Sequence, residues 1–200
     1  MVSNKLLINS EVYLKSGIHI GTKFKTKDMK GFVFKKRNDG LSIMNLQLID
    51  ERIRTAAKLL SNYEPEDILI VGRRENVWRA IKKFSKHTGA EVFAGRYPPG
   101  CLTNPNLPNH IEKQIIIVTD PWPDRNAIKD ALKIGIYVIA LCDTNNVFNG
   151  IDYVIPCNNK GRKSLGIIFY LLAREYLRNK GLIGSDKELD ESLSEFEGDD

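Results

Sequence analysis

The residue types that perform acid–base, nucleophilic or metal chemistry are few in this chain and are not grouped. Its histidines are His19, His87 and His110, and its three cysteines lack the spacing of a metal-binding cluster. No serine or cysteine lies in a nucleophile elbow, and no H-E-x-x-H motif occurs. His19 lies between two isoleucines, which favours a packed, hydrogen-bonded histidine over a catalytic base. These residues predict no catalytic centre and no metal site.

Two aspartates follow apolar runs that are typical of parallel strands. Catalytic carboxylates can lie at such positions, as Asp120 and Asp143 do here. A turn or capping residue follows each of them (Pro121 and Thr144), which favours a structural role. The turn Val71–Asn76 contains one glycine and neither G-x-G-x-x-G nor G-x-x-x-x-G-K-[ST]. We therefore expect no dinucleotide, flavin or ATP cofactor and no small-molecule substrate.

The segment from Thr22 to Arg37, called the basic segment below, carries the densest positive charge. Asp28 is the one acid within it, and phenylalanines are interleaved. Its seven cations are Lys23, Lys25, Lys27, Lys30, Lys35, Lys36 and Arg37. Lysine is a compact point charge that suits a phosphate backbone better than a base edge. The alternative is a solvated edge hairpin whose lysines prevent strand pairing, but seven charges exceed that need.

Further cations are candidates for phosphate contacts. Lys160, Arg162 and Lys163 precede the last apolar helix, whose start favours anions. Arg96 and Tyr97 open a Pro- and Asn-rich loop over residues 95–110, where they supply a cation and a stacking surface. Among the aromatic residues of the basic segment, Phe24 is a candidate for stacking on an unpaired base. Phe32 and Phe34 are expected to share one strand face that packs inward.

The net charge of +5 is divided unevenly along the chain. Residues 186–200 contain one lysine and eight acids, so they carry −7 and the rest carries +12. A basic body with an acidic tail suggests nucleic-acid binding. Leu189, Leu193 and Phe196 offer little apolar burial, so residues 185–200 are predicted to be disordered in the free protein. Their spacing also allows a helix docked on a partner protein.

Alternating strand and helix patterns predict an α/β fold with a mainly parallel sheet. The clearest unit is an apolar strand at 115–118, an amphipathic helix at 124–134 and a strand at 136–141. Further strands are expected at 67–72, 91–94 and 152–156, with helices at 46–61 and 165–180 and a hairpin turn at Asn38–Gly40. Arg174 and Arg178 are expected on the outer face of the last helix. Residues 1–184 thus form one domain, with the basic hairpin at 22–44 and the tail at 185–200.

No apolar run is long enough to span a bilayer, so no membrane association is expected. The longest candidate, Leu165–Ala173, is short and flanked by basic residues. Cys101, Cys142 and Cys157 form an odd number without a secretory signal, which suggests reduced thiols, most of them buried, in the cytoplasm.

Several strings in the chain together resemble one family. LKSGIHIG at Leu14–Gly21 is similar to the N-terminal signature of the universal small-subunit ribosomal protein S2 family, and PGCLTNP at Pro99–Pro105 resembles its central loop. VTDP at Val118–Pro121, with GIYVIALCDTN at Gly135–Asn145, resembles its second signature. VIPCNNKGRKS at Val154–Ser164 resembles its C-terminal motif. The matches span roughly residues 6–178.

The resemblance implies a flavodoxin-like three-layer fold that binds ribosomal RNA and neighbouring small-subunit proteins in the cytoplasm and supports subunit assembly and translation. It implies no catalytic residue and no obligate homo-oligomer. Bacterial members carry a helical hairpin after the central loop, whereas here Thr103–Asn104 is followed closely by Leu107–Pro108. The chain is thus more similar to archaeal and eukaryotic members, and the short acidic tail favours the archaeal type. An α/β enzyme that binds a nucleotide or phosphate ligand is the alternative, against which stand the missing phosphate motif and the basic body.

Overall fold

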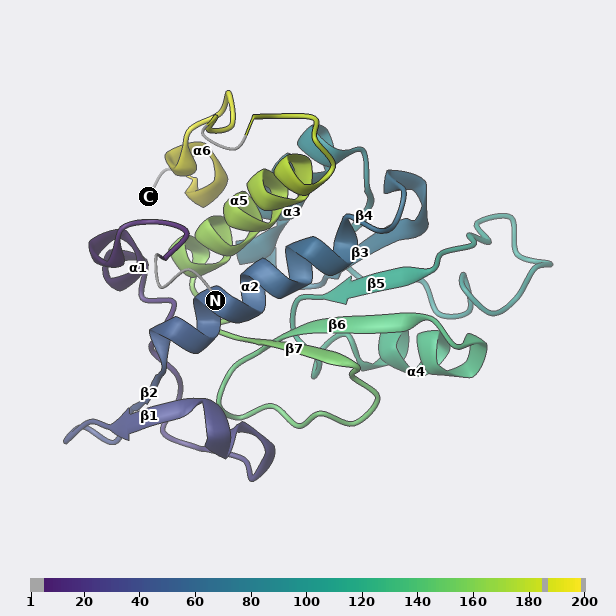
Figure 1. The fold of residues 1–200 in the computed structure, drawn as a ribbon. Helices are drawn as coiled ribbons and strands as arrows, with labels where there is room; N and C mark the ends of the chain where they lie inside the picture. Colours follow the sequence, from purple (N-terminus) through teal and green to yellow (C-terminus); the bar gives the residue numbers. More distant parts are fainter. Residues whose placement is uncertain (1–5, 185–186, 199–200) are drawn as a thin grey trace.

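The computed structural model describes residues 6–184 and 187–198, and within them a five-stranded parallel sheet forms the middle layer (Figure 1). The strand order is β4-β3-β5-β6-β7, the order of flavodoxin-like sheets. The strands are β3 (Ile68–Gly72), β4 (Glu91–Ala94), β5 (Ile115–Val118), β6 (Tyr137–Cys142) and β7 (Tyr153–Pro156). Every neighbouring pair is parallel, which confirms the predicted parallel sheet.

Helices cover both faces of the sheet because its central strands are apolar on both sides. Every residue of β3 and β5 is buried. Three helices pack over one face: α2 (Leu46–Leu60), α3 (Glu75–Thr88) and α5 (Arg162–Asn179). The other face carries α4 (Arg125–Ile134), which ends at Gly135 with φ 75° (Figure 1). The expected α/β fold class is thereby confirmed.

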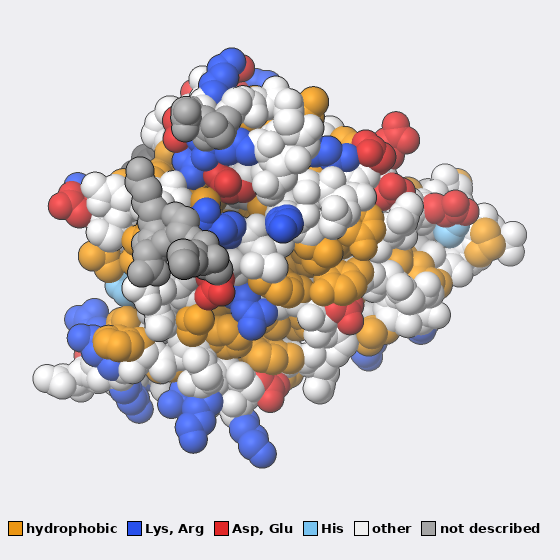
Figure 2. All heavy atoms as spheres, in the orientation of Figure 1, with side chains coloured by type: hydrophobic (Ala, Val, Ile, Leu, Met, Phe, Trp, Pro, Cys, Tyr) orange, Lys and Arg blue, Asp and Glu red, His pale blue; other side chains and the backbone are white. Residues whose placement is uncertain are grey.

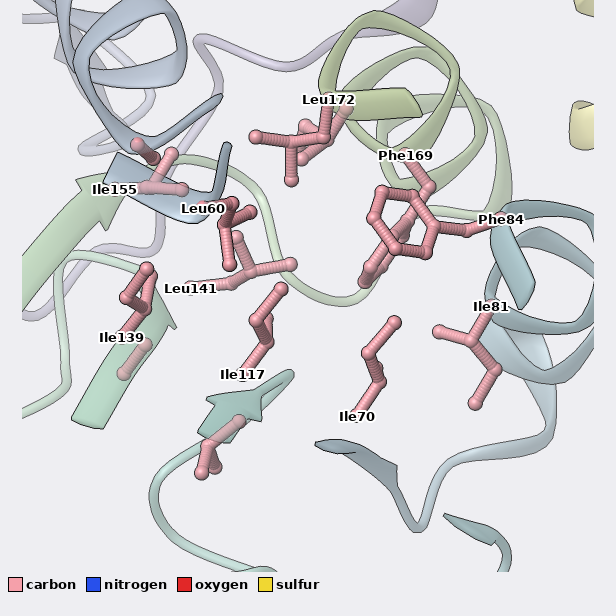
Figure 3. Close-up of a cluster of buried hydrophobic side chains, with 14 of the residues drawn as sticks. Leu60, Ile70, Ile81, Phe84, Ile117, Ile139, Leu141, Ile155, Phe169 and Leu172 are labelled. Atoms are coloured by element: carbon pink, nitrogen blue, oxygen red, sulfur yellow. The ribbon is translucent and has the colours of Figure 1, made fainter. Parts of the chain in front are cut away.

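The main core lies between the sheet and the three-helix layer. Figure 3 shows isoleucines and leucines of β3, β5, β6 and β7 pointing toward side chains of α2, α3 and α5. Phe84 and Phe169 meet there edge to face, with ring centroids 5.9 Å apart. This core fixes the loops at the carboxyl edge of the sheet.

The N-terminal part adds a short helix and a two-stranded sheet that pack against the main body. Helix α1 (Ser10–Ser16) ends at Gly17, and a 3₁₀ turn at Asp28–Phe32 leads into β1 (Val33–Lys36). β1 pairs antiparallel with β2 (Ser42–Met44), which runs directly into α2 (Figure 1). A second 3₁₀ turn, Pro65–Asp67, precedes β3.

Phe34 does not pack inward as the alternation of β1 suggested. The pairing register passes from Val33–Met44 to Lys35–Ile43, so Phe34 is the extra residue of a bulge. Its side chain is 70% exposed. Phe32 lies in the preceding 3₁₀ turn rather than in the strand, and it packs edge to face on Phe148.

The long loop after β4 packs onto α4, which corrects the expected role of Tyr97. Tyr97 is buried and its hydroxyl donates to Asp130 Oδ2 at 3.2 Å, so its ring is not a stacking surface. The Gly100 amide donates to the same oxygen at 2.8 Å. Arg96 remains exposed.

Arg174 is buried within α5 rather than placed on an outer face. It is 2% exposed, and its guanidinium donates to both Glu188 oxygens at 3.0 Å and to the Leu7 carbonyl at 2.8 Å. Arg178 pairs with Glu175 at 2.9 Å. The two arginines thus bind the tail and the N-terminal segment to α5.

Residues 187–198 of the tail pack against the body of the fold, which argues against the predicted disorder; residues 185–186 and 199–200 lie outside the described residues. Helix α6 (Leu193–Glu197) docks on α5 and α3. Phe196 is buried between His87 and Tyr170, and Lys83 pairs with Glu191 and Glu195 at 2.8 and 3.0 Å. The prediction of disorder considered only the few apolar residues of the tail. It did not include the ion pairs between the tail's acids and the cations of α3.

Candidate nucleic-acid interface

The basic segment is fastened to the loop that follows β6. The Thr22 amide donates to Thr144 Oγ1 at 2.9 Å, and the Thr26 amide donates to the Thr144 carbonyl at 2.9 Å. The Thr26 hydroxyl donates to the Asn146 carbonyl at 2.7 Å. Asp28 accepts from the Phe148 amide at 3.1 Å. The one acid inside the segment therefore serves as an anchor.

Gly21 allows the segment to approach this loop closely. A Cβ atom built on Gly21 would lie 2.4 Å from Thr144 Cγ2 and 2.8 Å from its Oγ1, nearer than non-bonded atoms can approach. The glycine is needed here for space, because its φ is not positive. The start of the basic segment is therefore held against Thr144, which fixes the position of the lysines that follow.

All seven predicted cations of the basic segment are exposed. Figure 2 shows Lys and Arg side chains gathered at the lower left and bottom, where Figure 1 places β1 and β2. Arg37 has a 3.3 Å ion pair with Asp39 in the hairpin turn. Phe24 is 80% exposed among the lysines, as a base-stacking residue must be. The segment thus presents a positive, partly aromatic surface.

The other predicted cations are distributed around the molecule. Lys160 lies next to the anchor, where its ammonium contacts Asp143 at 2.7 Å and Asn145 at 3.3 Å. Arg162 and Lys163 are exposed at the start of α5, and Arg162 faces the tail at Gly198. Arg96 lies in the loop just after β4, which is at the opposite edge of the sheet from β7. The structure therefore brings Lys160 near the basic segment but leaves Arg96 apart.

A buried polar network connects the loops at the carboxyl edge of the sheet. Asn146 donates to Asp120 Oδ1 at 3.3 Å, and Asn159 donates to Asn146 Oδ1 at 3.1 Å. The backbone amide of Asn158 donates to the Ile18 carbonyl at 2.8 Å, which holds the segment after α1 against this network. Sequence reasoning missed these asparagines and Thr144 as anchors, because the fold alone brings their partners together: Thr144 and Asn158 contact residues over a hundred positions away, and Asn146 and Asn159 contact residues of other loops.

The carboxyl edge between β3 and β5 is the switch point where flavodoxin-like sheets bind ligands. Here Arg74 pairs with Asp120 across it, donating to Asp120 Oδ2 from Nε at 2.9 Å and from Nη2 at 2.8 Å. A Cβ on Gly72 would lie 2.6 Å from Val77 Cγ1, so this glycine serves helix packing. Burial raises the pKa of Asp124, which accepts from the Arg73 amide at 3.4 Å, to about 6.

The histidine in the N-terminal signature is packed, as predicted, but not fully hydrogen-bonded. His19 Nδ1 is buried without a hydrogen-bond partner among the described residues. Burial, with Arg37 nearby, lowers the pKa of its imidazole, so the ring is neutral at pH 7. No group of three or more His, Cys, Asp or Glu in the described ranges is arranged to hold a metal ion. Nor does any helix in residues 6–184 or 187–198 have the length and apolarity to cross a membrane.

The comparison with known families decides between a ribosomal protein and an α/β enzyme that binds a nucleotide or phosphate ligand. The family model for ribosomal protein S2 matches residues 13–115 and 107–178 of the chain. The chain belongs to the ribosomal protein S2 family. It is a non-enzymatic protein. The N-terminal, second and C-terminal motifs converge in the polar network and in the Gly21–Thr144 contact, so they fasten the basic segment to the sheet, whereas the central-loop motif packs on α4.

Full-length relatives of the same family occur in archaea. The chain is 55% identical over 191 residues to a small ribosomal subunit protein uS2 of Nanoarchaeum equitans, covering 96% of this chain and 95% of that protein. It is 48% identical over 197 residues to the protein of the same name from Picrophilus torridus, with 98% of each covered. A Methanococcus maripaludis protein of this name is 49% identical over 186 residues, or 93% of this chain and 84% of that protein.

Proposed function

We infer that the chain is a structural component of the small ribosomal subunit, where it binds ribosomal RNA and adjoins other ribosomal proteins in the cytoplasm. The observation that carries the RNA contact is the anchored basic segment with its seven exposed cations. An anchored row of charges meets an RNA backbone without the entropy cost of ordering a free arm.

The chemistry of the segment suits phosphates. Lys23, Lys25 and Lys27 alternate with Phe24 and Thr26, and neither of the intervening side chains is charged. RNA helices hide their major groove, so backbone and shape contacts are the available readout. Each phosphate neutralised releases counterions, which makes the binding dependent on salt.

Lys160 has a narrower role in this proposal than the sequence suggested. Its ion pair with Asp143 sets the loop that receives Thr22, so it acts mainly as a support for the basic segment. Arg162, Lys163 and Arg96 stay proposed secondary phosphate contacts.

The role is tested by co-sedimentation of the full chain with small ribosomal subunits depleted of their own S2 protein, at moderate salt. Stoichiometric incorporation supports the proposal. Sedimentation of the chain apart from the subunits, with native circular dichroism, contradicts it.

A further inference from the structure

An exposed tryptophan stands at the end of β5, outside the basic segment. Trp122 is 74% exposed, and nothing in the described ranges covers its indole. Prolines flank it at 121 and 123, and its amide donates to Asp120 Oδ1 at 3.1 Å. Proline fixes the φ angle, so the backbone at Trp122 is already ordered. A large aromatic surface is thus presented to solvent in a defined position.

Three arginines surround this indole. Arg73, Arg74 and Arg125 line a hollow of about 580 Å³ together with Trp122, Pro123 and Asn126. Arg74 is held by Asp120, whereas Arg73 and Arg125 are exposed and have no ion-pair partner within residues 6–184 or 187–198. No acidic side chain lines the hollow.

Two carboxylates near this surface are buried and do not line the hollow. Arg74 and Asp120 neutralise each other, so Arg73 and Arg125 supply the exposed positive charge. Helices α3 and α4 begin at Glu75 and Arg125, so the positive ends of two helix dipoles add to the arginines.

We propose that the tryptophan–arginine surface, formed by Trp122, Arg73, Arg74 and Arg125, binds an unpaired nucleotide of ribosomal RNA; the proposal rests on the function inferred above. The base stacks on the Trp122 ring, and the phosphates beside it meet Arg73 and Arg125. Aromatic rings with flanking arginines are the means by which proteins hold single-stranded nucleotides. A helical backbone alone would need no indole.

The position of this surface suits a second contact with the same RNA. Trp122 follows β5 and Thr144 follows β6, and these two strands are neighbours in the sheet. Asn146 joins the two loops through its 3.3 Å hydrogen bond to Asp120. In this proposal the basic segment binds the phosphate backbone of the RNA, and the tryptophan–arginine surface binds an unstacked base of the same RNA.

The test uses the full chain and purified small-subunit ribosomal RNA. Trp122→Ala should weaken binding roughly 5- to 150-fold, the range for loss of one stacked base, and Trp122→Phe should restore most of it. Arg73→Gln with Arg125→Gln should lower the salt slope by about 0.7 for each lost contact. Leu182→Ala and Lys58→Gln remove an exposed apolar side chain and an exposed cation elsewhere, so they should leave both quantities unchanged.

A direct readout comes from fluorescence. In a Trp78→Phe background Trp122 is the one remaining tryptophan, and stacking on a base should quench it as RNA is added. Unchanged affinity, salt slope and fluorescence in these variants, with wild-type binding intact, would overturn this inference and leave the proposed function standing. An ultraviolet crosslink from Trp122 to a protein in assembled subunits would overturn it as well. If the wild-type chain neither binds the RNA nor enters subunits, the proposed function itself fails.

Discussion

Replacing Gly21 with alanine should loosen the basic segment without removing any of its charge. The new methyl group would lie 2.4 Å from Thr144 Cγ2, so the backbone at residue 21 and the loop after β6 must move apart. Overpacking of this kind costs about 1–3 kcal/mol. At about 2 kcal/mol, local opening becomes about 30-fold more frequent, since 1.4 kcal/mol is tenfold.

Hydrogen exchange reports this opening at two amides. Those of Thr22 and Thr26 donate to Thr144, so both should exchange about 30-fold faster in Gly21→Ala. RNA affinity should decrease in the same variant, because the lysines of the basic segment are no longer held in one position.

Gly31→Ala is the matched control for this substitution. It lies in the same segment, a Cβ there meets nothing within 4 Å, and its exchange rates should stay at wild-type values. Thr144→Ser removes the nearest clashing methyl group and should recover part of the loss in Gly21→Ala. Wild-type exchange at Thr22 and Thr26 in Gly21→Ala would refute the close-approach argument.

Three further outcomes follow from the structure. Hydrogen bonds from Lys83 and Lys86 hold the pKa of Glu191 at about 2, so docking of the tail is favoured above pH 4.5 and is lost as the pH falls toward 2. The protection of the amides of residues 187–197 against hydrogen exchange should therefore decrease between pH 4.5 and 2. Constant protection over this pH range would contradict the argument. Burial raises the pKa of Asp124 from 3.8 to about 6, so ionisation of this carboxyl destabilises the fold increasingly between these pH values and fully above about 6. Asp124→Asn should therefore raise the free energy of unfolding in urea titrations by up to about 3 kcal/mol at pH 7 and by only about 1 kcal/mol at pH 4.5. Equal gains at both pH values would rule out the ionisation argument. Calorimetric titration with ATP, flavin or dinucleotide should give no heat of binding, because the turn after β3 lacks a phosphate-binding glycine motif and Asp120 already pairs with Arg74. Micromolar affinity would revive the nucleotide-binding alternative.

The sheet could be predicted from the sequence because its signals are local. Ile115–Val118 is an unbroken apolar run, and Gly135 ends the helix that follows it. Such patterns depend on neighbouring residues, which is why the predicted strands and their parallel sheet agree with the structure.

The missed features depend on partners that are distant in the chain. Phe34 is exposed because one extra residue in β1 shifts the register, which alternation alone does not reveal. Arg174 is buried because Glu188 and the Leu7 carbonyl receive its guanidinium. The seven cations were visible in the sequence, but their anchor at Thr144 required the fold.

Salt-dependent RNA binding by Lys23→Gln, Lys25→Gln and Lys27→Gln combined tests the central claim most directly. The full-length triple variant should bind small-subunit ribosomal RNA more weakly, with a salt slope lower by about 0.7–0.9 for each lost contact and little change in sequence preference. A control with Lys15, Lys58 and Lys133 changed to Gln removes the same charge from other exposed positions and should keep the wild-type slope. Wild-type affinity and slope in the first variant, with native circular dichroism, would show that the basic segment is a solvated edge and not an RNA-binding surface.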